Sequence, residues 1–297
     1  MAPKWEKLKI IVVVGPTASG KTALSIKLAR KLNGEIISAD SRQVYRGLNI
    51  GTGKVTKKEM AGIPHHLLDV ADPKKVFTVA DFKRITEQKI KEIIARGHTP
   101  IIVGGTGFYV QAVVDDLVLP EVAPDKKLRA NLEATPPSEL FAMLKKLDPR
   151  RAREIDSKNP VRLIRAIEIA KELGRVPLLR QGYEGQAPYN FEIIGIRIDQ
   201  EELNKKIHKR LIERLEHGMI AEVKKLHRQG LGWKRMEELG LEYRCLARFL
   251  QGKITKPKMI EQLEKEIIKY SKRQMTWFKR DKRIKWIKLW TDLPVEA

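Results

Sequence analysis

The sequence predicts an α/β protein with a doubly wound parallel sheet and a mostly helical inserted domain. Residues 8–14 form an apolar, β-branched run that ends at Gly15, which is typical of a strand buried on both faces of a parallel sheet. Leucines at helical spacing follow over residues 21–32, and two more alternations of strand and helix come after them. Strands that alternate with helices in this way indicate a parallel sheet covered on both sides.

The order of the remaining elements supports this architecture. Further strands are expected over residues 35–39, 100–103, 190–198 and 284–289. Further helices are expected over residues 79–96, from about 106, and over 200–229, 236–250 and 257–279. Prolines and helical periodicities then dominate an intervening region, with helices expected over 125–132, 138–147 and 161–173. We therefore expect a core of residues 1–119 and 190–297 and a helical insertion over residues 120–189.

The charge of the chain favours a polyanionic partner. The chain has 59 lysines and arginines against 37 acidic residues, which gives a formal net charge of +22. Such an excess attracts nucleic acid, because each neutralised phosphate releases condensed counterions. A heat-adapted surface rich in lysine and glutamate is the alternative, although it does not explain so large an imbalance.

Cysteine content and hydropathy limit the class of protein. Cys245 is the single cysteine, which excludes an internal disulfide and a multi-cysteine zinc site, and we expect it to be a small buried residue. No stretch reaches the roughly 18–20 apolar residues of a transmembrane helix. The apolar run at residues 10–14 is too short for the core of a signal peptide. We therefore expect a cytoplasmic protein with no membrane partner, and a monomer by default.

A phosphate-binding loop separates the first strand from the first helix. It matches the pattern G-x-x-x-x-G-K-[ST] with Gly15, Pro16, Thr17, Ala18, Ser19, Gly20, Lys21 and Thr22. Glycines let the backbone N–H groups converge on phosphate oxygens at a helix N-terminus. Lys21 would neutralise the terminal phosphates, and the Thr22 hydroxyl would be a ligand of Mg²⁺. The sequence therefore predicts a P-loop NTPase-like core that binds a di- or triphosphate.

A second polar segment, Asp40-Ser41-Arg42-Gln43-Val44-Tyr45, follows the second predicted strand. Because the carboxyl ends of parallel strands face one crevice, Asp40 should lie near the phosphates as a base or a metal partner. Arg42 and Gln43 offer groups that could read a base or a phosphate. The simpler alternative for Asp40 is a turn or helix cap.

Two shorter motifs leave their roles open. Gly51-Thr52-Gly53-Lys54 is either a second anion-binding loop or a turn. His65 and His66 precede two leucines on a short predicted strand, where adjacent side chains point to opposite faces. A metal ion shared by these two histidines is therefore not expected.

Taken in order, these segments resemble the tRNA dimethylallyltransferase family, also called tRNA isopentenyltransferases. The matching segments are residues 15–22, 40–45, 50–54, Pro64-His65-His66-Leu67-Leu68-Asp69, Thr78-Val79-Ala80-Asp81-Phe82, Gly104-Gly105-Thr106-Gly107-Phe108-Tyr109, 159–168 and 272–278. Their order and spacing make the match specific, and it covers essentially the whole chain.

The resemblance implies transfer of a dimethylallyl group from dimethylallyl diphosphate to the exocyclic N6 of adenosine 37, in the anticodon stem-loop of tRNA, with Mg²⁺ as cofactor. A P-loop suits this reaction, because it stabilises the charge that develops on the leaving diphosphate. Asp40 would accept a proton from the weakly nucleophilic amine. By the same resemblance, Thr106 lies beside the reacting adenine and Arg210 contacts the diphosphate.

The resemblance also assigns contacts with tRNA. The segment that meets the target nucleotide, which must leave its stack, comprises Asp40, Ser41, Arg42 and Gln43, together with Thr106. Arg162 and Arg165, in the insertion, match a second tRNA-contacting segment. The alternative for these two arginines is a solvated helix face, because they stand three residues apart.

The C-terminal stretch favours the same partner. Residues 265–288 contain ten lysines and arginines and two acidic residues. Cations bind phosphates and aromatic rings can stack on bases, although we expect the tryptophans here to pack in the core. The aromatic residues in this stretch are Tyr270, Trp277, Phe278 and Trp286.

Two departures from the family pattern stand out. The usual Ile-Gly-Tyr-Lys-like stretch is Leu239-Gly240-Leu241-Glu242-Tyr243-Arg244 here, and we assign it no role. The lone cysteine excludes the zinc finger of some eukaryotic relatives, which favours the bacterial type.

Other functions compete with this interpretation. A small-molecule kinase explains the P-loop but not the basic tail, and an isopentenyltransferase acting on free adenine nucleotides has little use for a charge of +22. A non-catalytic RNA-binding protein does not need Lys21, Thr22 and Asp40. A terpenoid-type prenyltransferase needs clustered aspartates, whereas Asp115-Asp116 is followed by Leu117-Val118-Leu119.

Overall fold

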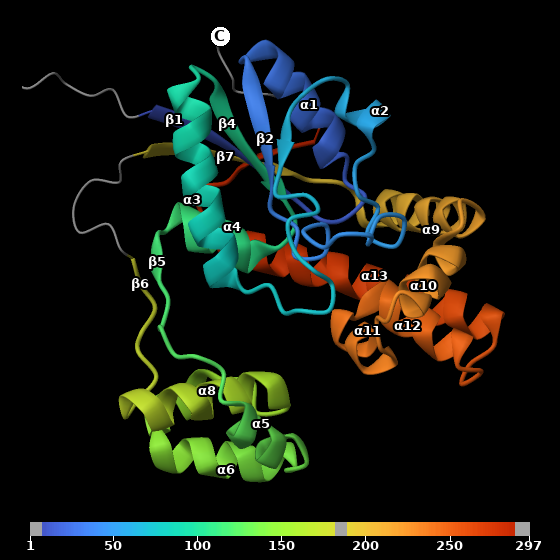
Figure 1. The fold of residues 1–297 in the computed structure, drawn as a ribbon. Helices are drawn as coiled ribbons and strands as arrows, with labels where there is room; N and C mark the ends of the chain where they lie inside the picture. Colours follow the sequence, from blue (N-terminus) through green and yellow to red (C-terminus); the bar gives the residue numbers. More distant parts are fainter. Residues whose placement is uncertain (1–7, 182–188, 289–297) are drawn as a thin grey trace, which may run out of the picture. The chain divides into compact units, whose positions relative to one another are not determined.

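The computed structural model describes residues 8–181 and 189–288, and its central element is a parallel sheet (Figure 1). Six strands pair in the order β3-β2-β4-β1-β7-β8, and every pairing in this sheet is parallel. The prediction of a doubly wound parallel sheet is confirmed. The strands are β1 (Leu8–Val14), β2 (Gly34–Ser38), β3 (His65–His66), β4 (Thr99–Gly104), β7 (Tyr189–Ile196) and β8 (Lys285–Ile287).

Helices cover both faces of the sheet, because successive residues of the buried strands point to opposite sides. Ile11 and Val13 of β1 pack with α1 (Lys21–Lys31). Ile10 and Val12 pack on the other side, against α3 (Val79–Ala95) and α4 (Gly107–Val114). Figure 1 shows α1 and α3 on opposite sides of the strands. A short helix, α2 (Lys57–Met60), precedes β3.

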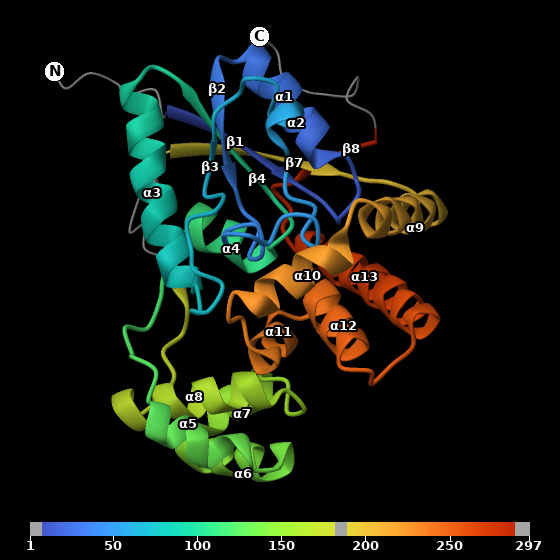
Figure 2. The same cartoon turned by 45° about the vertical axis from the view of Figure 1, so that its right-hand side comes forward.

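A separate group of helices packs on the segment that follows β2. The side chains of Val44, Tyr45 and Leu48 are buried among these helices in one apolar cluster. Figure 2 shows the helices gathered together. They are α9 (Gln200–Glu216), α10 (Met219–Arg228), α11 (Trp233–Leu239), α12 (Leu241–Leu250) and α13 (Lys256–Phe278). The cluster places the polar residues 40–43 and the loop 48–53 between the sheet and the helices that support them.

Two helices were predicted to be continuous, and both predictions are wrong because each helix is broken at a glycine. The helix expected over residues 200–229 is broken at Gly218, whose φ of 94° ends α9 and starts α10. The helix expected over 236–250 is broken at Gly240, whose φ is 74°. Side-chain-bearing residues rarely adopt such positive φ values, so glycine permits each break. Apolar periodicity runs on through both breaks, and it therefore hid them in the sequence.

Residues 116–182 form a second compact unit with its own apolar core. Its helices are α5 (Lys126–Glu133), α6 (Pro137–Leu147), α7 (Pro149–Glu154) and α8 (Pro160–Leu173), and the antiparallel pair of β5 (Leu117–Val118) with β6 (Arg180–Gln181) joins its ends. The short helix α7 was not predicted. The Asp148 carboxylate caps it by accepting a hydrogen bond from Arg151 N.

The predictions for Cys245 and for the tryptophans are confirmed within the described residues, whereas the bounds 120–189 of the insertion stay a prediction. Cys245 is 1% exposed, and burial raises the pKa of its thiol to about 11, so it is a protonated core residue. Trp277 and Trp286 pack against the core beside α3 and α4. The final strand begins at Lys285, while Leu289, the last residue of its predicted range, lies outside the described residues. No helix within residues 8–181 and 189–288 is long and apolar enough to cross a membrane.

A buried carboxylate ties the edge of the sheet to the end of α3. Glu35 on β2 is 3% exposed and accepts hydrogen bonds from Arg96 Nε (3.0 Å) and Nη2 (2.8 Å). Its oxygens also lie 2.6 Å from His66 Nε2 and 2.7 Å from His98 Nδ1, whereas His65 Nδ1 lies 2.8 Å from Ile63 O. The two adjacent histidines therefore have different partners. Burial alone would raise the pKa of Glu35, but the bonds to Arg96, His66 and His98 outweigh it and lower the pKa to about 2.

We expect Glu35→Gln to reduce the free energy of unfolding by about 2 kcal/mol at neutral pH, the usual scale for hydrogen bonds to a charged group. Because the pKa of Glu35 is lower in the folded chain, its stabilising contribution is present above about pH 4.5 and is lost as the pH falls toward about 2. Urea unfolding of both proteins across this range measures the difference. It should shrink as the pH falls; a constant difference, or an equal effect of the surface variant Glu87→Gln, would contradict the assignment.

Candidate active site

The P-loop lies between β1 and α1, as the sequence predicts. Its turn needs positive φ values at Gly15 (151°), Ala18 (61°) and Gly20 (91°). Gly20 is the N-cap of α1 and supplies no side-chain cap, and the first turn of the helix carries no acidic residue. The N–H groups at this end, together with the helix dipole, are therefore available to an anion. The buried Ser19 hydroxyl has no hydrogen-bond partner within the described part of the chain.

Cationic side chains gather at this loop. Lys21 Nζ donates to Pro16 O at 2.6 Å, so the side chain lies over the loop. Burial lowers the pKa of Lys21 to about 8, the Asp40 carboxylate acts in the opposite direction, and Arg210 lowers it further. Burial and the neighbouring Arg214 also lower the pKa of Arg210 from its ordinary value. An anion bound here would relieve the repulsion among these cations, which favours binding of a diphosphate.

Asp40 follows β2 and caps the turn of its own segment. Its Oδ1 accepts hydrogen bonds from Arg42 N (2.8 Å) and Gln43 N (3.2 Å). The turn cap, the simpler alternative, is therefore present in the structure. The same carboxylate is close enough to affect the pKa of Lys21 and of Tyr270. It thus lies near both the P-loop and α13. Capping the turn does not prevent the carboxylate from acting also as a general base.

Thr106 joins this segment to the turn after β4. Its Oγ1 accepts a hydrogen bond from Ser41 N at 3.0 Å, and its backbone N donates to Ala39 O at 3.3 Å. Thr106 also lies close enough to the Tyr270 phenol to affect its pKa. Burial and the nearby Asp40 carboxylate raise the pKa of Tyr270 to about 12, so this phenol stays protonated at neutral pH. Four of the predicted site residues, Asp40, Ser41, Thr106 and Lys21, are brought together here.

Two site residues on α13 were missed by the sequence analysis. Gln274 is 6% exposed and bridges two loops: Oε1 accepts from Thr17 N (2.8 Å), and Nε2 donates to Gly105 O (2.9 Å). Tyr270 lies one turn earlier on the same helix face. Their spacing with Trp277, at i, i+4 and i+7 among lysines and arginines, was the available signal for a buried face directed at the site.

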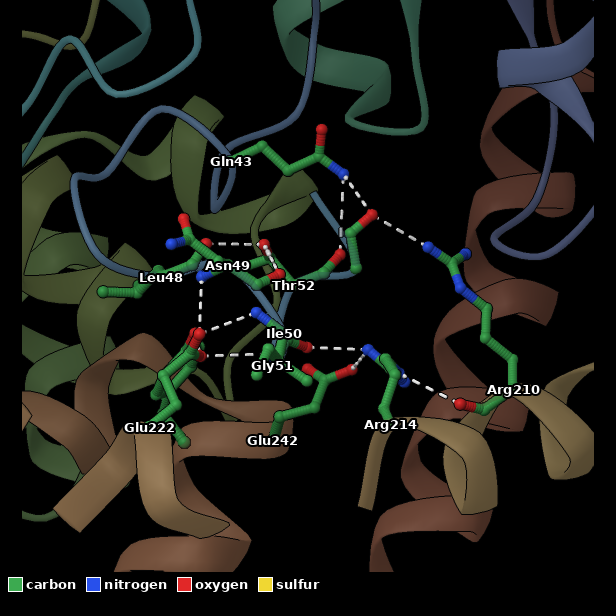
Figure 3. Close-up of polar contacts among 12 residues, drawn as sticks. Gln43, Leu48, Asn49, Ile50, Gly51, Thr52, Arg210, Arg214, Glu222 and Glu242 are labelled. Atoms are coloured by element: carbon green, nitrogen blue, oxygen red, sulfur yellow. Dashed lines mark hydrogen bonds and ion pairs between the residues drawn. The ribbon is translucent and has the colours of Figure 1, made fainter. Parts of the chain in front are cut away.

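Arg42, Gln43 and Arg210 are fixed by the surrounding helices and loops. Arg42 Nε donates to Leu239 O at 2.6 Å. Gln43 Nε2 and Arg210 Nη2 both donate to Gly53 O, at 3.3 Å and 2.9 Å (Figure 3). The residue expected to meet the nucleotide and the residue expected to meet the diphosphate therefore share one carbonyl. The stretch 239–244, which departs from the family pattern, contributes to this site through the Leu239 carbonyl.

The two predicted tRNA contacts of the insertion lie on α8 of the second unit. Arg162 is exposed, with its backbone N bonded to the Asn159 cap. Arg165 donates to Val122 O at 2.8 Å and to Glu168 at 3.3 Å, inside its own unit. Buried Glu168 also binds Arg129 through two hydrogen bonds of 2.6 Å and 2.7 Å. Contact of Arg162 and Arg165 with tRNA stays a prediction.

Comparison with known proteins decides the family. The family model described as IPP transferase matches residues 43–281. The chain belongs to the IPP transferase family. The tRNA dimethylallyltransferase of Anoxybacillus flavithermus is 41% identical over 287 residues, which cover 96% of this chain and 91% of that protein.

Two solved structures are similar to this IPP transferase. The full-length tRNA isopentenylpyrophosphate transferase of Bacillus halodurans has 38% identity and a TM-score of 0.71, covering 95% of this chain and 90% of that one. A eukaryotic dimethylallyltransferase acting on tRNA has 28% identity and a TM-score of 0.73, covering 91% of this chain and 70% of that one. The predicted family resemblance is confirmed, and the relatives are tRNA prenyltransferases rather than kinases.

Proposed function

We propose that this chain transfers the dimethylallyl group of dimethylallyl diphosphate to N6 of adenosine 37 in the anticodon stem-loop of a tRNA. The observation that carries the proposal is the meeting of two segments at the carboxyl edge of β1, β2 and β4. The P-loop with Lys21 occupies one side of this edge, and Asp40 with the Ser41–Thr106 hydrogen bond occupies the other. The P-loop would therefore hold the diphosphate, and Asp40 would act as the general base beside it. The chain belongs to the IPP transferase family, in which similar proteins are tRNA dimethylallyltransferases.

The proposed step exchanges one bond for another. A bond forms between N6 of the adenine and the allylic carbon, and the bond from that carbon to the diphosphate oxygen breaks. Asp40 accepts the N6 proton, while the P-loop N–H groups, Lys21 and Arg210 stabilise the charge on the leaving diphosphate. Thr106, whose hydroxyl accepts a hydrogen bond from Ser41 N, orients the adenine.

The residues at the start of α1 fit a magnesium ion held mainly by the substrate. Thr22 offers a hydroxyl next to Lys21, and within the described residues no three His, Cys, Asp or Glu side chains are placed to hold a metal. Mg²⁺ commonly keeps several waters and binds substrate phosphates with one or two protein ligands. Thr22 would supply such a ligand, and the ion would neutralise charge on the diphosphate.

A single-turnover assay tests the proposed function. The enzyme is mixed with dimethylallyl diphosphate, Mg²⁺ and an unmodified anticodon stem-loop, with free AMP and with ATP as controls. We expect prenylated adenosine in the RNA alone. Product on AMP alone would assign the chain to the nucleotide isopentenyltransferases, and consumption of ATP without prenyl transfer would indicate a kinase.

A monomeric state and a cytoplasmic location remain predictions.

The affinity for tRNA should fall steeply with salt if the net charge of +22 serves RNA binding. Each phosphate contact contributes a slope of roughly −0.7 to −0.9 to the plot of log affinity against log salt. We expect a slope of about −3 or steeper, and a slope less steep by about 1 in Arg162→Gln if that residue contacts a phosphate. Filter binding at several salt concentrations measures this. A flat response would point instead to a surface charged for heat adaptation.

A further inference from the structure

A carboxylate from α10 binds the glycine loop 48–53 in the way that an external anion would (Figure 3). Glu222 Oε2 accepts hydrogen bonds from Asn49 N (3.0 Å) and Ile50 N (2.7 Å), and Oε1 accepts one from Gly51 N (3.0 Å). The Tyr243 hydroxyl donates to Oε1 at 2.8 Å. The sequence left this loop open as an anion site or a turn. Its N–H groups bind an anion that belongs to the same chain.

The carbonyls of the same loop hold the two substrate-facing side chains. Gly53 O accepts from Arg210 Nη2 (2.9 Å) and from Gln43 Nε2 (3.3 Å). Arg214 Nη1 donates to Gly51 O at 2.7 Å and to Glu242 at 3.1 Å. The loop therefore has donors bound by Glu222 on one side and acceptors that fix Arg210 and Gln43 on the other.

The glycines of the loop are required by close approach. A Cβ on Gly51 would lie 2.7 Å from the Tyr243 hydroxyl oxygen, and a Cβ on Gly53 would lie 2.1 Å from Arg210 Nη2. Gly53 also has a φ of 58°. Tyr243 is 1% exposed, and burial together with the Glu222 carboxylate raises the pKa of its phenol, so it remains a hydrogen-bond donor. The loop is thus shaped to receive Tyr243, Glu222 and Arg210.

We propose that Glu222 is a positioning residue for both substrates, acting through the loop 48–53 on Arg210 and on Gln43. The inference rests on the proposed function for the identity of the two substrates. Because three of its N–H groups donate to one carboxylate, the loop is held in a single conformation. This conformation sets the position of Gly53 O, which accepts hydrogen bonds from both side chains. The Tyr243 hydroxyl donates to the same carboxylate oxygen as Gly51 N and so also holds the carboxylate in place. The stretch 239–244, which departs from the family pattern, therefore acts on the site through this tyrosine.

Glu222→Gln tests the inference because it keeps the shape and adds a donor. Its amide NH₂ must face either the N–H groups of Asn49 and Ile50 or the Gly51 N–H and the Tyr243 O–H, which places donor against donor. Glu237→Gln is the matched control, since Glu237 makes two hydrogen bonds with Arg248 (2.8 Å and 2.9 Å) in the same group of helices. Tyr243→Phe is a milder variant that removes one donor to Glu222.

Three quantities are measured for each variant: the affinity for inorganic diphosphate by calorimetry, the KM for each substrate, and Tm. Loss of one positioned hydrogen bond to a charged group corresponds to a decrease in affinity of about tenfold. We expect Glu222→Gln to weaken diphosphate binding by about tenfold and to raise both KM values, while Glu237→Gln matches the wild type. A merely structural role would lower Tm and the apparent kcat, leaving both KM values and the diphosphate affinity of the folded fraction unchanged, and would overturn the inference.

Partial results also decide the question. A rise in KM for only one substrate overturns the shared role of the loop. If Glu222→Gln does not fold, Tyr243→Phe decides: several-fold weaker diphosphate binding supports the inference, and wild-type affinity overturns it. If the wild type binds diphosphate but forms no prenylated RNA, the proposed function fails, while the calorimetric comparison still tests how Glu222 positions Arg210.

Discussion

Replacing Asp40 with asparagine should reduce the single-turnover rate of prenyl transfer by about 10²–10⁴-fold, the usual contribution of a general base. The substitution is selective because the amide oxygen of the new side chain can still accept the hydrogen bonds from Arg42 N and Gln43 N that Oδ1 of Asp40 accepts now. The turn is retained, and the capacity to take up a proton is lost. Rapid-quench measurement of prenylated RNA under saturating substrates gives the rate.

Asp40→Ala provides the comparison, because it removes the turn cap together with the base. We expect both variants to lose turnover, and only Asp40→Ala to lose tRNA affinity as well, since the cap orders the segment that faces the nucleotide. An unchanged rate in Asp40→Asn would leave the carboxylate with the turn cap as its sole role.

Lys21→Met should slow transfer by about 10²–10³-fold, the usual loss when one donor to a developing negative charge is removed. Methionine keeps the length and the apolar stem of the side chain while removing its charge. The measurement is again the single-turnover rate, together with the affinity for inorganic diphosphate. A rate within about threefold of the wild type would remove Lys21 from the proposed diphosphate site.

The pH dependence of diphosphate binding isolates the Lys21 charge. Burial lowers the pKa of Lys21 to about 8, and the Asp40 carboxylate acts in the opposite direction. A bound diphosphate favours the protonated amine, so the wild-type affinity should fall as the pH rises through about 8. The difference between wild type and Lys21→Met should therefore shrink above this pH. A difference that stays constant from about pH 7 to about pH 9.5 would contradict this assignment.

Much of the site could be predicted because its signals are local in the chain. The P-loop needs a strand, a glycine-rich turn and a helix in direct succession, and all three are contained in residues 8–31. Asp40 follows a strand whose position in the sheet is a consequence of parallel topology. The loop that carries Thr106 follows β4 for the same reason.

Contacts between distant segments could not be predicted from the sequence. Gln274 bonds Thr17 across 257 residues, and Glu222 bonds Asn49 across 173. A glutamate on an amphipathic helix has the same local pattern whether it faces water or a glycine loop. The breaks at Gly218 and Gly240 were missed for a related reason, because continuous apolar spacing outweighed two glycines whose positive φ is visible only in the fold.

The sequence by itself determined the parallel sheet, the phosphate loop and the order of the family's segments, since each depends on residue types at short spacing. The tertiary structure alone decided which side chains complete the site: Tyr270 and Gln274 from α13, and Glu222 with Tyr243 behind the glycine loop. The physical reason is that unpaired N–H groups and carbonyls must find partners when they are buried. Packing of α9–α13 on residues 44–48, rather than any local pattern, selects those partners.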